Sequence, residues 1–182
     1  MIAYIVLILA ALSRFVPHAL HGTGLNFTAV GAGLLFFGSR RPRWQALAAV
    51  AILAATDFYL TRFVYGYPFE VKGYLVTWAW YAAVCVLASG LLRKITVLRV
   101  AAGVLASATS FFLLSNLVVW FGSGMYAHNA SGLAACYVAA LPFYANDLIS
   151  TGLLSAALFG LPVLAAKLTE ALHSTPHNQP LA

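Results

Sequence analysis

The feature that most constrains this chain is a series of apolar runs long enough to cross a lipid bilayer. Gly73–Leu92 and Val100–Phe121 each continue without a charged residue, and about 20 such residues cross a bilayer core as a helix. Of the 182 residues, 63% are hydrophobic and 8% are charged, whereas soluble domains carry about 25% charged residues. A soluble fold of this size could not bury so much apolar surface, so the sequence predicts an all-α membrane protein.

Six apolar runs predict a compact bundle of about six transmembrane helices, forming one domain at residues 1–172. The runs are Ile2–Leu12, Asn26–Gly38, Ala46–Phe63, Gly73–Leu92, Val100–Phe121 and Asp147–Lys167. The first run is too short to span alone, so Arg14 is expected within the first span, near one end, snorkelling or paired. The second run, of roughly 13 residues, is tilted, packed inside the bundle, or not a full span. The polar tail, 173–182, is predicted to be disordered and cytoplasmic.

Basic residues gather in two of the predicted connections. These clusters are Arg40, Arg41 and Arg43, and Arg93, Lys94 and Arg99. Cytoplasmic loops of membrane proteins carry an excess of Lys and Arg, so both chain termini are predicted to be cytoplasmic. The formal net charge of +6 therefore reflects membrane topology and does not indicate a nucleic-acid partner.

With this topology, the strongest polar groups of separate segments fall near the outer face. Such residues are costly in a membrane and often mark function, so we expect a water-accessible pocket that binds a small molecule. Its predicted ligand-binding residues are Arg14, Asn26, Asp57, Trp78, Asn116, Tyr137 and Asp147. Structural roles stay open for several of them: Arg14 and Asp57 could only pair with each other, Asn116 could bond a neighbouring helix, and Asp147 could be a helix N-cap.

The stretch before the last predicted span is apolar but too short to cross the membrane. Gly132–Leu141 is expected to form a short helix or re-entrant segment on the outer side, ended by Pro142. Its apolar stripe, which would face the bundle with Tyr137 near the pocket mouth, is Leu133, Tyr137, Val138 and Leu141. The turn Phe143–Asn146 would line the pocket, and Asp147 would cap the sixth helix.

No motif indicates a metal, a cofactor or a catalytic centre. The possible outer metal ligands lack the spacing of a helical metal pair; they are His18, His21, His128 and Cys136. Two acidic residues that could reach the pocket, Asp57 and Asp147, are too few to indicate an enzyme.

Small residues four positions apart predict where helices approach closely in lipid. They are Gly152, Ala156 and Gly160 on the sixth run, Ala51 and Ala55 on the third, and Ala102 and Ala106 on the fifth. This spacing supports a compact bundle, although frequent alanine alone would also explain the alanine pairs.

Short pieces spread over about Arg14 to Gly160 form a specific pattern. They are Asn26–Ala32, Phe36–Gly38, Asp57, Ser110–Phe112, Ser115-Asn116, Trp120, Gly132-Leu133, Cys136-Tyr137 and Pro142-Phe143. In order and spacing they resemble an uncharacterised family of small bacterial integral membrane proteins. The resemblance implies a multi-pass protein of the cell (inner) membrane, and the family has no established activity to carry over.

More distantly, the layout is similar to the substrate-capture subunits (S-components) of energy-coupling factor vitamin transporters. That similarity implies six helices with both ends inside, a vitamin or metal ion bound near the outer face, and a transmembrane coupling subunit with ATPases as partner. One departure concerns docking on that partner: the first helix reads Ala3, Leu7, Ala11 where the family often has a close-packing alanine pair.

Three functions follow as hypotheses. The leading one is a solute-binding or transport subunit, S-component-like, that captures a small vitamin-like nutrient. The first alternative is a membrane enzyme acting on a lipid or isoprenoid, with Asp57 or Asp147 facing the bilayer at headgroup depth. The second alternative is a non-catalytic membrane scaffold protein.

Overall fold

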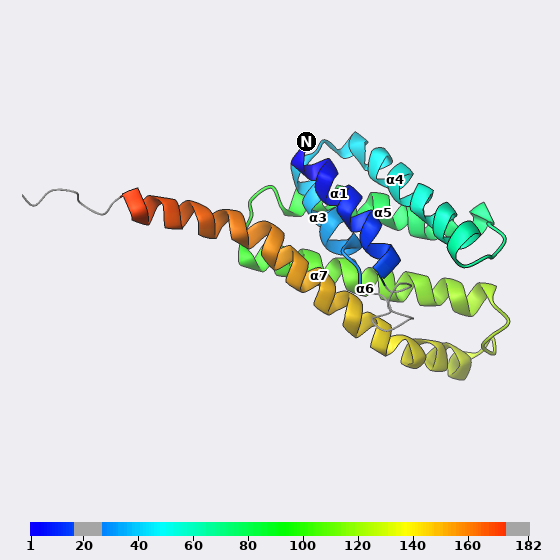
Figure 1. Ribbon diagram of the computed structural model, residues 1–182. Helices are drawn as coiled ribbons and strands as arrows, with labels where there is room; N and C mark the ends of the chain where they lie inside the picture. Colours follow the sequence, from blue (N-terminus) through cyan, green and yellow to red (C-terminus); the bar gives the residue numbers. More distant parts are fainter. Residues whose placement is uncertain (17–26, 174–182) are drawn as a thin grey trace, which may run out of the picture.

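The computed structural model describes residues 1–16 and 27–173, and these residues form helices joined by short connections (Figure 1). The α-helices are α1 (Ile2–Leu12), α3 (Val30–Arg40), α4 (Ala46–Tyr59), α5 (Val71–Leu91), α6 (Val97–Gly122) and α7 (Ala130–His173). Two 3₁₀ turns, Ser13–Phe15 and Arg43–Gln45, and one π turn, Leu60–Val64, extend α1 and α4. Asn26, the histidines of the first loop and the tail from 174 lie outside the described residues.

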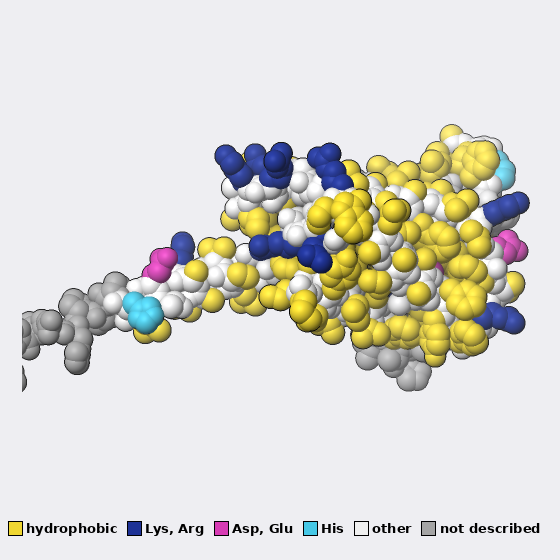
Figure 2. Space-filling model, turned by 90° about the horizontal axis from the view of Figure 1, so that it is seen from above, with side chains coloured by type: hydrophobic (Ala, Val, Ile, Leu, Met, Phe, Trp, Pro, Cys, Tyr) yellow, Lys and Arg dark blue, Asp and Glu magenta, His cyan; other side chains and the backbone are white. Residues whose placement is uncertain are grey.

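Four helices are long and apolar enough to cross a membrane. They are Arg43–Val64, which includes α4 and its flanking turns, and α5, α6 and α7. Large apolar side chains cover the outside of the bundle (Figure 2), with Leu47, Leu98 and Leu153 all more than half exposed. A soluble protein rarely exposes such a continuous apolar surface, so the protein is a multi-pass membrane protein whose outer surface faces lipid.

The shortest predicted span, α3, lies at the centre of the bundle. It packs against α1, α5, α6 and α7, and every residue from Gly31 to Gly38 is buried. A helix that is apolar on all sides is suited to a fully enclosed position. Of the alternatives for this short run, packing inside the bundle is confirmed.

Glycines of α3 allow the neighbouring helices to come close. A Cβ on Gly33 would lie 2.5 Å from the Cβ of Ala10 in α1. A Cβ on Gly38 would lie 2.7 Å from the Cα of Cys85 in α5. Only hydrogen fits at these crossings, so the helix contacts depend on the absence of a side chain.

The small residues predicted to mark helix contacts do not do so. The alanine pairs of α4 and α6 are exposed, as are Ala156 and Gly160, and Gly152 is only in ordinary contact with Val104 at 3.9 Å. α3 occupies the centre of the bundle, and its own glycines, Gly33 and Gly38, make the close crossings instead.

The basic clusters and both ends of the described chain lie at one end of the bundle. Tyr4 donates a hydrogen bond to Gln45 at 3.1 Å, which places the start of α1 beside the first basic connection. Arg43 donates to Ser89 at 3.0 Å, next to the second basic connection. Lys167 lines a groove together with Ile95, and Figure 2 shows Lys and Arg gathered beside the extension of α7.

The stretch Gly132–Leu141 is helical, but Pro142 does not end it. Pro142 and Pro162 both lie inside the continuous helix α7, so the predicted re-entrant segment and the turn Phe143–Asn146 are wrong. Proline is tolerated inside membrane helices because neighbouring groups and local adjustments satisfy the freed carbonyl. Asp147 is consequently a residue of the helix interior and not an N-cap.

Half of the predicted stripe of this segment is wrong: Leu133 and Tyr137 are partly buried, whereas Val138 and Leu141 are exposed. Val138 and Leu141 are 64% and 51% exposed, and the buried positions are Gly132, Cys136 and Ala140. These three recur every four residues and are small, so α7 can approach α6 closely along them. Large apolar side chains face outward here because lipid, not water, surrounds the helix.

Candidate functional site

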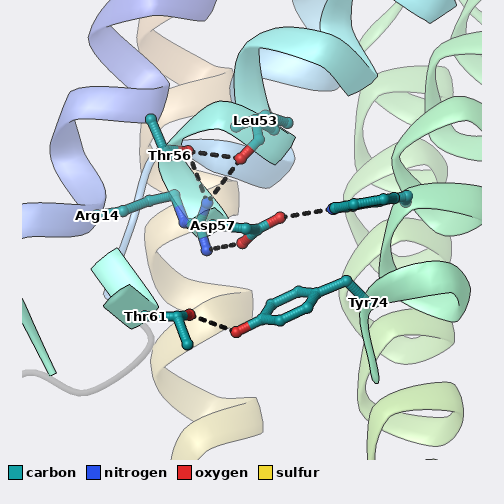
Figure 3. Close-up of polar contacts among 7 residues, drawn as sticks. Arg14, Leu53, Thr56, Asp57, Thr61 and Tyr74 are labelled. Carbon is teal, nitrogen blue, oxygen red and sulfur yellow. Dashed lines mark hydrogen bonds and ion pairs between the residues drawn. The ribbon is translucent and has the colours of Figure 1, made fainter. Parts of the chain in front are cut away.

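A buried ion pair joins the first helix to α4. Asp57 is 2% exposed, and its Oδ1 atom forms an ion pair with Arg14 Nη2 (Figure 3). Trp78 Nε1 of α5 donates to the other oxygen, Oδ2, at 2.9 Å. Both carboxylate oxygens therefore have a partner, as a buried charge requires.

The second terminal nitrogen of Arg14, Nη1, also binds α4. Arg14 Nη1 donates to Thr56 Oγ1 at 2.7 Å and to the Leu53 carbonyl oxygen at 3.3 Å. The 3₁₀ turn Ser13–Phe15 carries Arg14, and Tyr81 of α5, 4% exposed, lies within electrostatic reach of the pair. The planar fork of arginine suits such multiple contacts.

A π turn follows the ion pair directly. In Leu60–Val64 the backbone N–H of Tyr65 donates to the Leu60 carbonyl at 2.8 Å, and such turns occur frequently at functional sites. Within it, the Thr61 hydroxyl and the Tyr74 hydroxyl are hydrogen-bonded at 2.5 Å (Figure 3). The Tyr74 ring stacks on Trp78, with centroids 6.0 Å apart, which connects the π turn to the ion pair.

A separate pocket of about 220 Å³ lies between α6 and α7. Its polar side chains are Asn116, Ser115 and Asp147, and its walls include Phe112, Phe143 and Tyr144. Asn116 Nδ2 donates to the Phe112 carbonyl at 2.8 Å, which leaves the amide oxygen as an acceptor. Aromatic walls with a few polar groups are typical of small-molecule sites.

Asp147 lies much deeper than predicted. The Tyr144 hydroxyl, one turn before it, contacts Thr109 Oγ1 at 3.0 Å, and Thr109 is near the middle of α6. Asp147 therefore lies near the middle of the α6–α7 pair, whereas Asn116 lies toward the hairpin end. The pocket reaches from the part of the bundle nearer the α6–α7 hairpin toward its centre.

The structure brings the predicted site residues together in two groups instead of one. Arg14, Asp57 and Trp78 form the ion-pair group, and Asn116 and Asp147 line the α6–α7 pocket. Tyr137 is adjacent to this pocket. Its hydroxyl donates to the Leu113 carbonyl at 2.8 Å and its ring contacts Phe112 edge-on, with centroids 5.3 Å apart. The seventh residue, Asn26, is outside the described residues.

Sequence reasoning missed several polar partners. Thr56 precedes Asp57 and binds Arg14, and Tyr81 follows Trp78 by three residues, a spacing that places both on one face of a helix. That spacing could have indicated Tyr81. No local pattern indicates the contact of Thr109 with Tyr144, because it depends on how α6 and α7 are aligned.

A family model matches residues 1–172, almost the whole described chain. The chain belongs to DUF6580, a family of unknown function. No curated protein and no solved structure matched the chain. The DUF6580 assignment agrees with the expected uncharacterised family and assigns no catalytic activity. Within residues 1–16 and 27–173, no group of three or more His, Cys, Asp or Glu side chains could hold a metal ion.

Proposed function

We propose that this DUF6580 protein binds a small solute in the α6–α7 pocket, as a solute-capture or transport subunit of a cell membrane. The pocket carries the proposal, because it combines Asn116, Asp147 and aromatic walls inside an otherwise apolar bundle. Its volume of about 220 Å³ is below the roughly 300–1,000 Å³ of drug-sized sites. The solute is therefore a compact molecule, of the size of a small vitamin or its precursor.

The ion-pair group supports the proposal by holding the neighbouring helices in place. Arg14, Asp57 and Trp78 tie the first helix to α4 and α5. Trp80 of α5 then donates to Ser110 of α6 at 2.8 Å and contacts Phe111, a wall of the pocket, with centroids 4.7 Å apart. The ion pair thus helps to hold the helices that form the pocket walls in place.

A membrane enzyme for lipids or isoprenoids has weaker support. It needs a carboxylate facing the bilayer at headgroup depth. Asp57 is 2% exposed with both oxygens bound, and Asp147 is near the middle of the bundle. An S-component-like subunit instead needs an enclosed polar pocket and, as partner, a coupling subunit with ATPases.

Retention of a solute tests the pocket. Mass spectrometry of protein purified in mild detergent should detect a bound small molecule, and that molecule should raise the melting temperature of ligand-free protein. Asn116→Ala should weaken binding about two- to tenfold, because a hydrogen bond to a buried polar group contributes roughly 0.5–1.5 kcal/mol. The matched control Thr169→Ala removes a hydroxyl bonded to Ala165 at 3.0 Å, far from the pocket, and should bind normally.

Two results would contradict this function. One is that no small molecule is retained and none in a panel of vitamins and their precursors raises the melting temperature. The other is a retained molecule whose affinity is unchanged in Asn116→Ala, which would place it elsewhere in the bundle.

The membrane orientation is a further part of the proposal and has its own test. Cysteines introduced at Ser39 and Ile95, at the basic end, should resist a membrane-impermeant thiol reagent added outside. Cysteines at Gly66 and Ser123 should react, because the basic end is expected to be cytoplasmic. The opposite labelling pattern would invert the topology and open the pocket to the cytoplasm.

A further inference from the structure

Three buried hydroxyl groups between α6 and α7 have no hydrogen-bond partner among the described residues. They belong to Ser107, Thr151 and Ser155, which are 1%, 0% and 0% exposed. Buried polar groups are normally hydrogen-bonded, and an unsatisfied one in an apolar interior is unfavourable. Three in one region call for a ligand that supplies the missing contacts.

Gly31 of α3 brings two of these hydroxyls to one point. A Cβ on Gly31 would lie 2.5 Å from Thr151 Oγ1 and 3.3 Å from Ser107 Oγ. The two oxygens therefore both lie close to the bare Cα of Gly31, where α3, α6 and α7 meet (Figure 1). Any residue other than glycine would clash with Thr151.

A carboxylate lies on the same side of α7. Asp147, Thr151 and Ser155 follow one another at four-residue spacing, so they share one face of the helix. The Asp147 carboxylate lies near enough to the Thr151 hydroxyl for that hydroxyl to donate to it, although the contact is outside ordinary hydrogen-bond geometry. In the part of the chain that the structure describes, no Lys, Arg or His forms an ion pair with Asp147.

The polar side chains form a row between two cavities; they are Asp147, Thr151, Ser155 and Ser107. Asp147 lines the solute pocket at one end. Ser155 lines a second, mainly apolar groove of about 720 Å³ between the other halves of α6 and α7. Thr151 and Ser107 lie between them in the core.

We propose that Asp147, Thr151 and Ser107 form a binding site for a monovalent metal cation, namely Na⁺. The donor set consists of oxygen atoms only, which suits hard cations. Its single carboxylate balances one positive charge, and a divalent ion would leave a net charge uncompensated in the membrane interior. Protonation of Asp147 alone would neutralise the carboxylate but leave the Ser107 hydroxyl without a partner.

The site would also influence what the neighbouring pocket binds. With Na⁺ beside Asp147, the inner end of the pocket carries no net charge, so a neutral or anionic solute is accepted there. The inference does not depend on the solute proposal, because the cation contacts lie in the core and only Asp147 is shared.

The test uses purified protein in detergent with no solute added. NaCl is replaced stepwise by choline chloride at constant ionic strength and pH. A ligand that binds only the folded state stabilises it in proportion to ln(1 + [L]/Kd). The melting temperature should therefore rise with Na⁺ and not with choline, and the protein should retain ²²Na⁺ at about one ion per chain.

Two hydroxyl deletions identify the site. Thr151→Val keeps the shape of the side chain, and Ser107→Ala removes only an oxygen without a partner, so both variants should melt in choline at the wild-type temperature or above it. Both should lose the Na⁺-dependent shift and most of the ²²Na⁺. Thr169→Val, the matched control on the exposed part of α7, should keep the full shift.

The possible outcomes separate this inference from its rivals. Equal melting temperatures in Na⁺ and choline, or a full Na⁺ shift in Thr151→Val, would overturn it and indicate that the hydroxyls hold water. A melting temperature that responds to pH in Na⁺-free buffer but does not respond to added Na⁺ would overturn it in favour of protonation. Asn116→Ala should bind solute more weakly but keep the Na⁺ shift, so failure of the solute pocket and failure of the cation site give different results.

Discussion

Asp57→Asn should lower the free energy of unfolding by about 3–5 kcal/mol, the usual cost of removing one partner of a buried ion pair. The side chains of Arg14 and Asp57 are 19% and 1% exposed, so water cannot replace the missing carboxylate. Asparagine has almost the same shape and can still accept from Trp78, which isolates the loss of charge. Reversible unfolding in mixed micelles measures the difference.

Two further variants distinguish the cost of an unpaired charge from the cost of a lost hydrogen bond. Trp78→Phe keeps an aromatic ring and removes one hydrogen bond, so it should cost only about 1 kcal/mol. The double variant Arg14→Met with Asp57→Leu should cost less than Asp57→Asn, because no charge is left unpaired. If Asp57→Asn unfolds like the wild type, the ion pair is not formed in the membrane. If the double variant folds but no longer binds solute, the pair also contacts the ligand.

The contact of Arg14 with Asp57 could be predicted from the sequence. Both residues interrupt apolar runs, and a charge within a span needs a partner or water. The run Ile2–Leu12 coincides with α1, and the 3₁₀ turn that begins at Ser13 ends it. The limits of α5 and α6 also lie close to those of their apolar runs, since apolar length decides what can span a bilayer.

The path of α7 was not predictable from local signals. Pro142 and the following Asn146-Asp147 form a typical helix stop and start in water. Inside a membrane a backbone turn is costly unless it is covered, so the helix continues through the proline. This single change moves Asp147 from the outer end to the middle of the bundle and explains why one predicted pocket became two groups.

The central position of α3 also required the structure. The run around Leu35 is short, and sequence alone left three interpretations open. Its burial follows from contacts with five other helices, none of which has a signature in the run itself. The glycines of α3 could have indicated a central helix, because Gly weakens a helix and is kept where backbones approach closely. The alanine and glycine spacing on α4, α6 and α7 gave an equally clear pattern, however, and that pattern does not mark helix contacts.

Gly38→Ala should destabilise the protein by at least about 3 kcal/mol, at the upper end of the range for overpacked cores. The added Cβ would meet Cys85 of α5 at its Cα, 2.7 Å away, and would lie closer still to its carbonyl oxygen. These atoms belong to the backbone of a helix, so no side-chain rotation can relieve the clash, and α3 would have to move away from α5. The same unfolding measurement in mixed micelles detects this loss.

Gly73→Ala is the matched control, because it makes the same chemical change in α5 where nothing lies within 4 Å of the added Cβ. It should be neutral or stabilising by up to about 1 kcal/mol, since alanine favours a helix more than glycine does. Gly33→Ala, whose Cβ would meet only the Cβ of Ala10 at 2.5 Å, should fall between the two. Equal stability of the Gly38 and Gly73 variants would mean that α3 does not cross α5 closely, and the central position of α3 would then be wrong.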